Sequence, residues 1–303
     1  MQEIYDVLWE NSRSTAVALG YFDGVHIGHR FLISEMENYA KKNHLDKGIF
    51  TFTKSVNLGH KGKDILSEEQ KLSVMQSLKI DLFYSPDFSV FSQLTPREFV
   101  EQVLIKSMGA KAVFCGENFL FGKNRSGTTA VLKELCSEHN IEVFILPTIT
   151  LDGQTVSSTA IRQALVQGDM ERVNVMLGRP YSVDFTVVHG KSLGKTLGTP
   201  TINQVYPSGM CTPKEGVYIT KTTVEGKAYP SATGFGTRPT VEGENQSCET
   251  FIKDFSGDLY NKNIKVEFYK YLYPPQKFDT TQELGAMILS AAEQSANYFS
   301  QKL

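Results

Sequence analysis

The sequence has few cysteines, and none of them forms a close pair. Its 303 residues include only Cys115, Cys136, Cys211 and Cys248, with no C-x-x-C spacing among them. This arrangement disfavours both a structural zinc site and a disulfide framework. We therefore expect a cytoplasmic protein whose thiols stay reduced.

The sequence also lacks an excess of charge of either sign and lacks long apolar runs. Its 31 basic residues nearly balance its 33 acidic ones, for a net charge of -2, so a nucleic-acid partner is not expected. No apolar run approaches the roughly 20 residues that cross a bilayer, and the first ten residues do not resemble a signal peptide. We expect small-molecule substrates, no membrane, and a monomer or weak homo-oligomer.

In the first part of the chain, short apolar runs alternate with amphipathic stretches. Strand-helix alternation of this kind predicts βαβ units and a parallel sheet. The predicted strands cover residues 14–22, 47–53, 80–86, 110–116 and 141–147, and the predicted helices cover 30–43, 67–78, 95–108 and 128–140.

After about residue 181 the pattern changes to short strands joined by Gly-, Pro- and Asn-rich turns. Such a pattern is typical of an antiparallel barrel or sandwich. Gly178 and Pro180 should stop a helix at the change, which predicts domains at 1–180 and 181–303. The later strands are expected at 183–190, 216–224, 228–236, 248–255 and 263–272, followed by a helix over 281–303.

The segment Gly20 to Arg30, "GYFDGVHIGHR", places two histidines where the first strand gives way to a helix. A glycine-ended strand that feeds a helix exposes backbone N–H groups and the positive end of the helix dipole, which together attract anions. Gly24 and Gly28 would let a ligand approach the backbone. His26 in the turn and His29 in the first helical turn could then both point at a bound phosphate.

Two other interpretations of this histidine pair remain open from spacing alone. A metal site is the weaker one, because two histidines three residues apart need a third ligand. The other is that one histidine caps the helix and the second is incidental.

The pattern Gly-x-Phe-Asp-Gly-x-His-x-Gly-His, Gly20 to His29, resembles the signature of the HxGH nucleotidyltransferases. More narrowly, it resembles the N-terminal half of the bifunctional riboflavin kinase/FMN adenylyltransferase family, as do "GENFLFGKNRSG", Gly116 to Gly127, and "SSTAIR", Ser157 to Arg162. Taken alone, Ser-Ser-Thr before a helix is more often a cap than a ligand site.

This resemblance implies a Rossmann-like domain that transfers the adenylyl group of ATP to FMN, without a covalent enzyme intermediate. His26 and His29 would be the catalytic residues. The implied ATP-binding residues are Gly20, Phe22, Asp23, Gly24, Gly28, Asn118, Ser157, Ser158, Thr159 and Arg162.

The first half departs from the family at one place. The family usually carries an Asp-Pro-His-Pro run after the second strand, whereas this chain reads "TFTKSVNLGHKG" over residues 51–62. Phe52 is kept and is the flavin-binding candidate of this half. ATP binding is therefore better supported here than flavin affinity.

From Gly178 onward the chain resembles the flavokinase module, which is an antiparallel β-barrel. The resemblance implies a second ATP site made by Gly190, Gly194, Lys195, Gly198, Thr201 and Asn203. Thr201 and Asn203 are two apart in an extended stretch, so their side chains share a face and offer oxygens that suit Mg²⁺. Alternatively, Asn203 bonds its own backbone in a turn.

Glu249 falls at the position of the family's catalytic glutamate. A riboflavin kinase needs a base for the 5′-hydroxyl of riboflavin as this hydroxyl attacks the γ-phosphate. A salt-bridged structural role for Glu249 stays open. Arg238, in "GFGTRPTVEG", is a candidate for flavin binding, or merely pins its turn.

The barrel half also departs from its family pattern. Lys195 stands in place of an arginine, Thr199 in place of a phenylalanine, and "LYPPQKF" (272–278) in place of a motif that closes over riboflavin. The main hypothesis is an enzyme of FAD biosynthesis that makes FMN from riboflavin and FAD from FMN, using ATP and Mg²⁺. The alternatives are an FMN adenylyltransferase with a kinase-impaired, flavin-binding barrel, and a flavin or nucleotide sensor.

Overall fold

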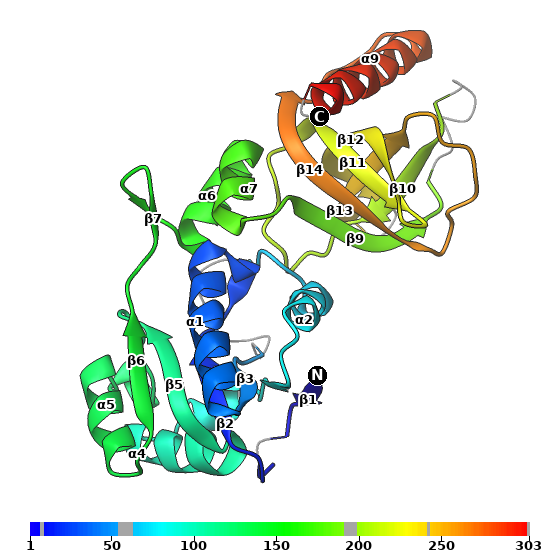
Figure 1. The fold of residues 1–303 in the computed structure, drawn as a ribbon. Coiled ribbons are helices and arrows are strands. Elements are labelled where there is room, and N and C mark those ends of the chain that lie inside the picture. The colour runs from blue at the N-terminus through cyan, green and yellow to red at the C-terminus, as the bar shows by residue number, and fades with distance from the viewer. Residues whose placement is uncertain (7–8, 54–62, 191–198, 241–242, 302–303) are drawn as a thin grey trace. The chain divides into compact units, whose positions relative to one another are not determined.

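The structure is a computed structural model that describes residues 1–6, 9–53, 63–190, 199–240 and 243–301, with backbone alone at 238–240 and 243–245. The chain divides into two compact units (Figure 1). Unit 1 comprises Met1–Gly62 and Leu66–Ser157, and unit 2 comprises Lys63–Ile65 and Ser158–Leu303.

Unit 1 is built on a parallel sheet, as predicted, with six strands where the sequence analysis expected five. The strand order is β1-β4-β3-β2-β5-β6. The order in which successive strands are added therefore reverses at β2: β3 and β4 lie on one side of it, and β5 and β6 lie on the other. In open α/β sheets, ligands bind at the carboxyl ends of the strands beside such a switch point. The strands are β1 (Gln2–Ile4), β2 (Thr15–Leu19), β3 (Asp46–Phe50), β4 (Leu82–Tyr84), β5 (Ala110–Gly116) and β6 (Glu142–Leu146).

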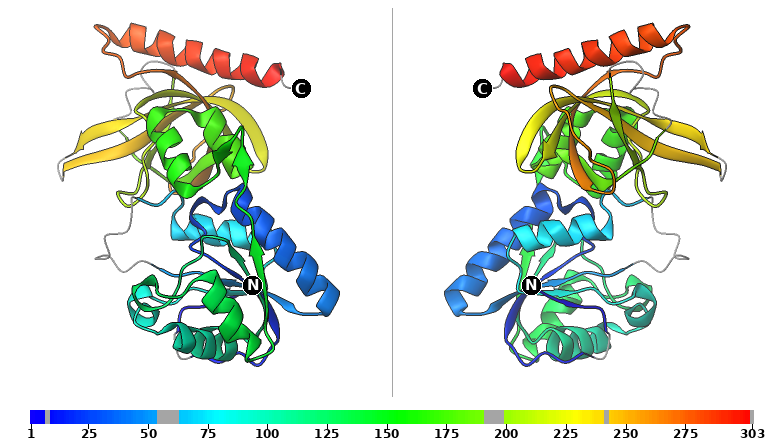
Figure 2. Two further views of the ribbon diagram at one scale, coloured as in Figure 1. Left: turned by 90° about the vertical axis from the view of Figure 1, so that its left-hand side faces the viewer. Right: turned by 90° about the vertical axis from the view of Figure 1, so that its right-hand side faces the viewer.

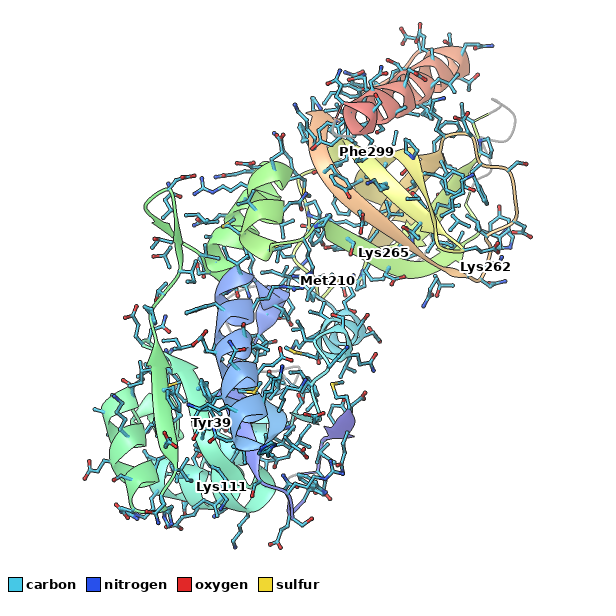
Figure 3. The ribbon with its side chains drawn as sticks, in the orientation of Figure 1. Tyr39, Lys111, Met210, Lys262, Lys265 and Phe299 are labelled. Carbon is cyan, nitrogen blue, oxygen red and sulfur yellow. The ribbon has the colours of Figure 1, made fainter. Side chains whose placement is uncertain are left out.

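Helices cover both faces of this sheet (Figure 2). On one face, Tyr39 of α1 packs on Phe114 of β5 and Phe144 of β6, with ring centroids 5.7 and 5.1 Å away (Figure 3). On the other face, η2 and α5 share a core with Leu19 and Val113. The helices are η1 (Asp23–Val25), α1 (Ile27–Asn43), α2 (Glu68–Ser77), α3 (Phe88–Phe91), α4 (Pro96–Glu98), η2 (Phe99–Ser107), η3 (Lys123–Arg125) and α5 (Thr129–Ser137).

Unit 2 contains a closed antiparallel barrel. Its order is β10-β13-β12-β11-β14-β9, and β10 closes it by pairing with both β13 and β9. Of the two architectures predicted for this half, a barrel or a sandwich, the structure shows the barrel. Its strands are β9 (Tyr181–Val188), β10 (Thr201–Val205), β11 (Gly216–Val224), β12 (Lys227–Thr240), β13 (Gly243–Ile252) and β14 (Asn263–Tyr273).

In the described part of unit 2, helices α6, α7 and α9 accompany the barrel. Helices α6 (Ser158–Gln167) and α7 (Met170–Leu177) precede it, and α7 ends at Gly178 in the left-handed conformation, as predicted. Helix α9 (Thr281–Ser300) lies across the outside of β12 and β11 (Figures 1 and 2). Although α6 and α7 group with the barrel, a functional division at residue 180 stays a prediction.

The sequence did not predict every element. It missed β1, which adds to β4 at the sheet edge, and the short hairpin of β7 (Thr150–Leu151) and β8 (Gln154–Thr155). These segments are only two or three residues long, so they carry too little periodicity to be recognised. No described helix combines the length and the apolar character needed to span a membrane.

All four cysteines are buried and unpaired with one another. Burial raises the pKa of the Cys115 and Cys136 thiols to about 12 each. These side chains are therefore protonated, non-nucleophilic core groups rather than reactive ones.

A chain of buried hydroxyl groups links three neighbouring strands of the barrel. Thr222 bonds Ser231 (2.8 Å), Ser231 bonds Thr220 (3.0 Å), Thr220 bonds Thr233 (2.9 Å) and Thr233 bonds Thr250 (2.8 Å). Each of these five residues is fully buried. Because each hydroxyl satisfies its neighbour, the network makes a polar barrel interior tolerable.

Replacing the middle of this network should destabilise the protein. Thr233→Val keeps the side-chain shape but removes the hydroxyl partner of buried Thr250 and one of the two hydroxyl partners of Thr220, which should cost about 1–3 kcal/mol. Urea denaturation followed by circular dichroism measures the loss. The control is Thr186→Val, whose hydroxyl bonds Asn263 at the surface. An equal effect of both substitutions would contradict the role given to the network.

Candidate functional sites

The turn after β2 carries the histidine motif at the switch point of the sheet. The N–H of Gly20 still bonds Phe50 of β3 (3.2 Å), and the chain then turns through η1 into α1. Gly24 has a φ of 78° in this turn, a conformation that glycine adopts without strain. Phe22 and Asp23 are buried there, with Asp23 only 1% exposed.

The two histidine rings stack on each other at the start of α1. His26 is the N-cap residue, and its Nδ1 accepts a hydrogen bond from the backbone N–H of His29 (3.3 Å). The ring centroids are 3.6 Å apart with an interplanar angle of 16°. Because Nδ1 of His26 is an acceptor, the neutral ring is assigned its proton on Nε2. The capping interpretation is thus correct for His26, and the cap leaves Nε2–H as a donor.

His29 is held in its neutral form. Burial lowers the pKa of His29 well below its usual value, and the neighbouring His26 and Lys71 lower it further. Its Nδ1 is buried and has no hydrogen-bond partner within the described part of the chain. The pair therefore offers ring N–H donors at the N-terminus of α1, which suits an anionic ligand.

Lys71 is a buried charged residue beside the histidine turn that the sequence analysis did not single out. It is 2% exposed, and its Nζ lies 4.7 Å from the centroid of the Tyr21 ring and 3.4 Å from Glu68 Oε1. Lys71 and Met75 are the buried residues of α2. Lys71 and Met75 are four residues apart and so lie on the same face of α2. This spacing is the sequence signal that could have indicated that Lys71 is buried.

Asn118 lies in a loop at the end of β5, the strand next to β2. Phe121 and Gly127 exchange backbone hydrogen bonds of 3.0 and 2.9 Å, which closes the loop predicted from Gly116 to Gly127. Asn118 is exposed. Because β2 and β5 are parallel neighbours, Asn118 and the histidine turn lie at the same edge of the sheet.

Phe52 is packed in an aromatic cluster rather than displayed alone. Its ring centroid lies 4.8 Å from Tyr21, 5.0 Å from Phe88 and 5.5 Å from Phe91. A flavin contact by Phe52 stays a prediction. Most of the divergent segment, residues 54–62, lies outside the described residues.

The Ser-Ser-Thr-x-x-Arg motif begins α6, as expected. Ser157 directly precedes the helix, and Ser158 and Thr159 are its first two residues. The Nε of Arg162 donates to the carbonyl of Lys63 (2.8 Å), a partner that sequence alone could not predict. Phosphate binding by these four motif residues stays a prediction.

In the barrel, strand register brings two predicted site residues face to face. Asn203 of β10 lies directly opposite Glu249 of β13, and Thr201 lies opposite Phe251. Directly opposed residues of antiparallel strands share a face, as do residues two apart in one strand. Thr201, Asn203 and Glu249 therefore project from one face of the barrel wall.

Glycines make room around this group. A Cβ at Gly190 would lie 2.4 Å from Asn203 Nδ2, so a larger residue there would require the Asn203 side chain to move. On β12, Gly234 pairs with Glu249, and a Cβ at Gly234 or at Gly236 would meet no atom closer than 4.0 Å. These two glycines, which the sequence analysis did not single out, leave open space beside Glu249.

Other predicted barrel residues are less defined. Gly194, Lys195 and Gly198 lie outside the described residues, and Arg238 is placed on β12 opposite Asn245 by its backbone. Thr199 is fully buried, and its hydroxyl has no hydrogen-bond partner in the described structure.

The divergent "LYPPQKF" stretch begins with the last two residues of β14 and continues beyond that strand. β14 ends at Tyr273, whose hydroxyl accepts a hydrogen bond from Gln294 of α9 (3.3 Å). Tyr273 also packs on the small core formed by Ala232, Ala291 and Ala292. In this chain the start of the stretch is therefore attached to α9.

The oxygen donors of the barrel site fit magnesium. A hydroxyl, a carboxamide oxygen and a carboxylate on one face (Thr201, Asn203, Glu249) are the hard ligands that Mg²⁺ accepts alongside water and phosphate. Asn203 Nδ2 lies 3.5 Å from Thr201 O, at the limit of a hydrogen bond. Among the described residues, no group of three or more His, Cys, Asp or Glu side chains could hold a metal.

Together, the two units define a protein with a nucleotidyltransferase-like α/β unit and a kinase-like β-barrel. Residues 9–160 match the FAD synthetase family and residues 177–299 match the riboflavin kinase family. Bifunctional riboflavin kinase/FMN adenylyltransferases are similar over nearly the whole chain: that of Bacillus subtilis is 30% identical, covering 98% of this chain and 96% of the relative, and that of Listeria monocytogenes is 32% identical, covering 95% and 93%.

The chain belongs to the bifunctional riboflavin kinase/FMN adenylyltransferase family, and is an enzyme of FAD biosynthesis. The predicted family, fold class and type of enzyme are thereby confirmed. A solved structure described as a macrolide-efflux protein from Streptococcus pneumoniae shares the fold, with a TM-score of 0.87, 28% identity and 98% coverage of both chains.

The low pKa of His29 predicts a pH-dependent stability. Below about pH 6.5 the unfolded chain protonates this histidine while the folded chain does not, so acid favours unfolding. His29→Gln should therefore lose less unfolding free energy than the wild type between pH 7 and pH 5.5. Urea titrations at both pH values measure this difference, and an equal or larger loss in the variant would contradict it.

The contact at Gly190 predicts a selective loss of the barrel's activity. Gly190→Ala should displace the Asn203 side chain from its present position and lower riboflavin phosphorylation by about tenfold or more, while FAD formation from FMN stays near the wild-type rate. The control is Gly209→Ala, where a Cβ meets nothing within 4 Å. Product chromatography measures both activities, and full kinase activity in Gly190→Ala would disprove the assignment.

Proposed function

We propose that unit 1 adenylylates FMN at the histidine turn. A phosphate oxygen of FMN attacks the α-phosphorus of ATP, the bond from that phosphorus to the bridging oxygen breaks, and pyrophosphate leaves with the electron pair. His26 donates Nε2–H to the phosphate oxygens, His29 donates beside it, and the first N–H groups of α1 add to the same field. Catalysis is then positioning and charge stabilisation.

We further propose that the barrel phosphorylates riboflavin. Glu249 accepts the proton of the 5′-hydroxyl as this oxygen attacks the γ-phosphorus of ATP, and ADP leaves. Thr201 and Asn203 would hold Mg²⁺, which, when bound, neutralises charge on the polyphosphate. The open space over Gly234 and Gly236 would accommodate the flavin beside Glu249, with Arg238 as a further flavin contact.

One observation carries the proposal: each unit has its own pair of polar side chains suited to one of the two reactions. The stacked pair of His26 and His29 lies in unit 1, and the opposed pair of Asn203 and Glu249 lies in unit 2. A flavin sensor would need no base at Glu249. We also propose that the enzyme works in the cytoplasm, where its four buried cysteines stay reduced.

Substitutions in the two units should separate the two activities. His29→Ala should reduce FAD formation from FMN by about a hundredfold or more, since it removes a donor to the transferring phosphate. Glu249→Gln should reduce riboflavin phosphorylation by about a hundredfold or more, since it removes the base. Chromatography of reactions with riboflavin or FMN plus Mg-ATP measures each activity.

In each variant, the activity of the unit that was not changed shows that the protein is folded. His29→Ala should still phosphorylate riboflavin, and Glu249→Gln should still make FAD from FMN. Equal loss of both activities in either variant would overturn the assignment of roles. A wild-type chain that makes FAD but no FMN would support the kinase-impaired alternative.

A further inference from the structure

We propose that Lys71 is a positioning residue for adenylyl transfer, supplying positive charge behind the histidine turn to hold the polyphosphate of ATP. This inference rests on the proposed function of unit 1. It adds a residue from α2 to a site that the sequence motifs place entirely on other elements.

The position of Lys71 ties α2 to the turn that carries the histidines. Its ammonium lies over the ring of Tyr21, the residue that follows Gly20 at the end of β2. Helix α2 also packs beside η1, the turn that leads into His26. The charge is therefore fixed next to the place where α1 begins.

The burial of this charge calls for a reason. A lysine side chain that is 3% exposed has lost almost all contact with water, which is costly unless its charge is compensated. Its carboxylate partner, Glu68, is 47% exposed and sits three residues earlier on the same helix, at 3.4 Å. A solvent-screened partner of this kind compensates a buried charge weakly.

A polyphosphate would complete the compensation. His29 is neutral, so it offers the ligand an N–H but no net charge. Lys71 provides that net charge from α2, while His26, His29 and the start of α1 provide directional donors. A point charge attracts a phosphate chain from any direction, whereas oriented N–H groups fix its position, so the two kinds of group together hold it effectively.

The test compares three variants in the conversion of FMN to FAD with Mg-ATP. Lys71→Met should raise the KM for ATP and lower kcat/KM for ATP by about tenfold or more, with the KM for FMN changed less than about twofold. Lys71→Arg should recover much of the loss because it keeps the charge. Lys47→Met is the matched control, since Lys47 is also largely buried and pairs with Glu37 at 3.3 Å at the other end of β3.

Riboflavin phosphorylation by the same preparations shows whether each variant is folded. If wild-type protein makes FAD and Lys71→Met behaves like Lys47→Met, the inference about Lys71 is wrong while the proposed function stands. If the KM for FMN rises instead of that for ATP, the assignment to the polyphosphate is wrong. If the wild type makes no FAD, the proposed function itself fails.

A second readout does not depend on activity. Within the described part of the chain, His26 and Lys71 are the charged or titratable neighbours that shift the pKa of His29. Removing the lysine charge should raise the pKa of His29, and Lys71→Arg should leave it near the wild-type value. NMR titration of the His29 ring in the ligand-free protein measures this, and an unchanged pKa in Lys71→Met would overturn the proposed coupling.

Discussion

The hydrogen bond from the His29 N–H to Nδ1 of His26 is the contact on which the first site depends. This bond caps the N-terminus of α1, directly after the turn that follows β2. It also fixes which ring nitrogen of His26 can donate to a ligand. The stacking of the two rings then sets His29 beside it. A helix cap and an anion site are usually alternative explanations of such a residue, but here the cap creates the donor.

The barrel site depends on a different constraint, the register of its strands. Asn203 faces Glu249 only because β10 and β13 pair as they do. A slip of one residue would exchange Glu249 for Cys248 or Thr250, which are fully buried on the other side of the strand. Closure of the barrel, in which β10 pairs with both β13 and β9, holds that register.

The sequence predicted most features that depend on neighbouring residues in the chain, and few that depend on contacts between distant residues. The βαβ pattern, the N-terminal position of His26 and His29, and the stop of α7 at Gly178 follow from periodicity and cap chemistry. The opposition of Asn203 and Glu249 depends on a pairing across 46 positions, which no local pattern encodes. Lys71 was missed because a single lysine in an amphipathic helix is normally a solvated residue.

The protonation of His26 in the ligand-free protein tests the central claim most directly. Long-range ¹H–¹⁵N NMR correlations at pH 7.5 distinguish the two neutral forms of a histidine ring and the charged form. The account predicts a neutral His26 with its proton on Nε2 and an acceptor Nδ1. A proton on Nδ1, in either the neutral or the charged ring, would contradict it.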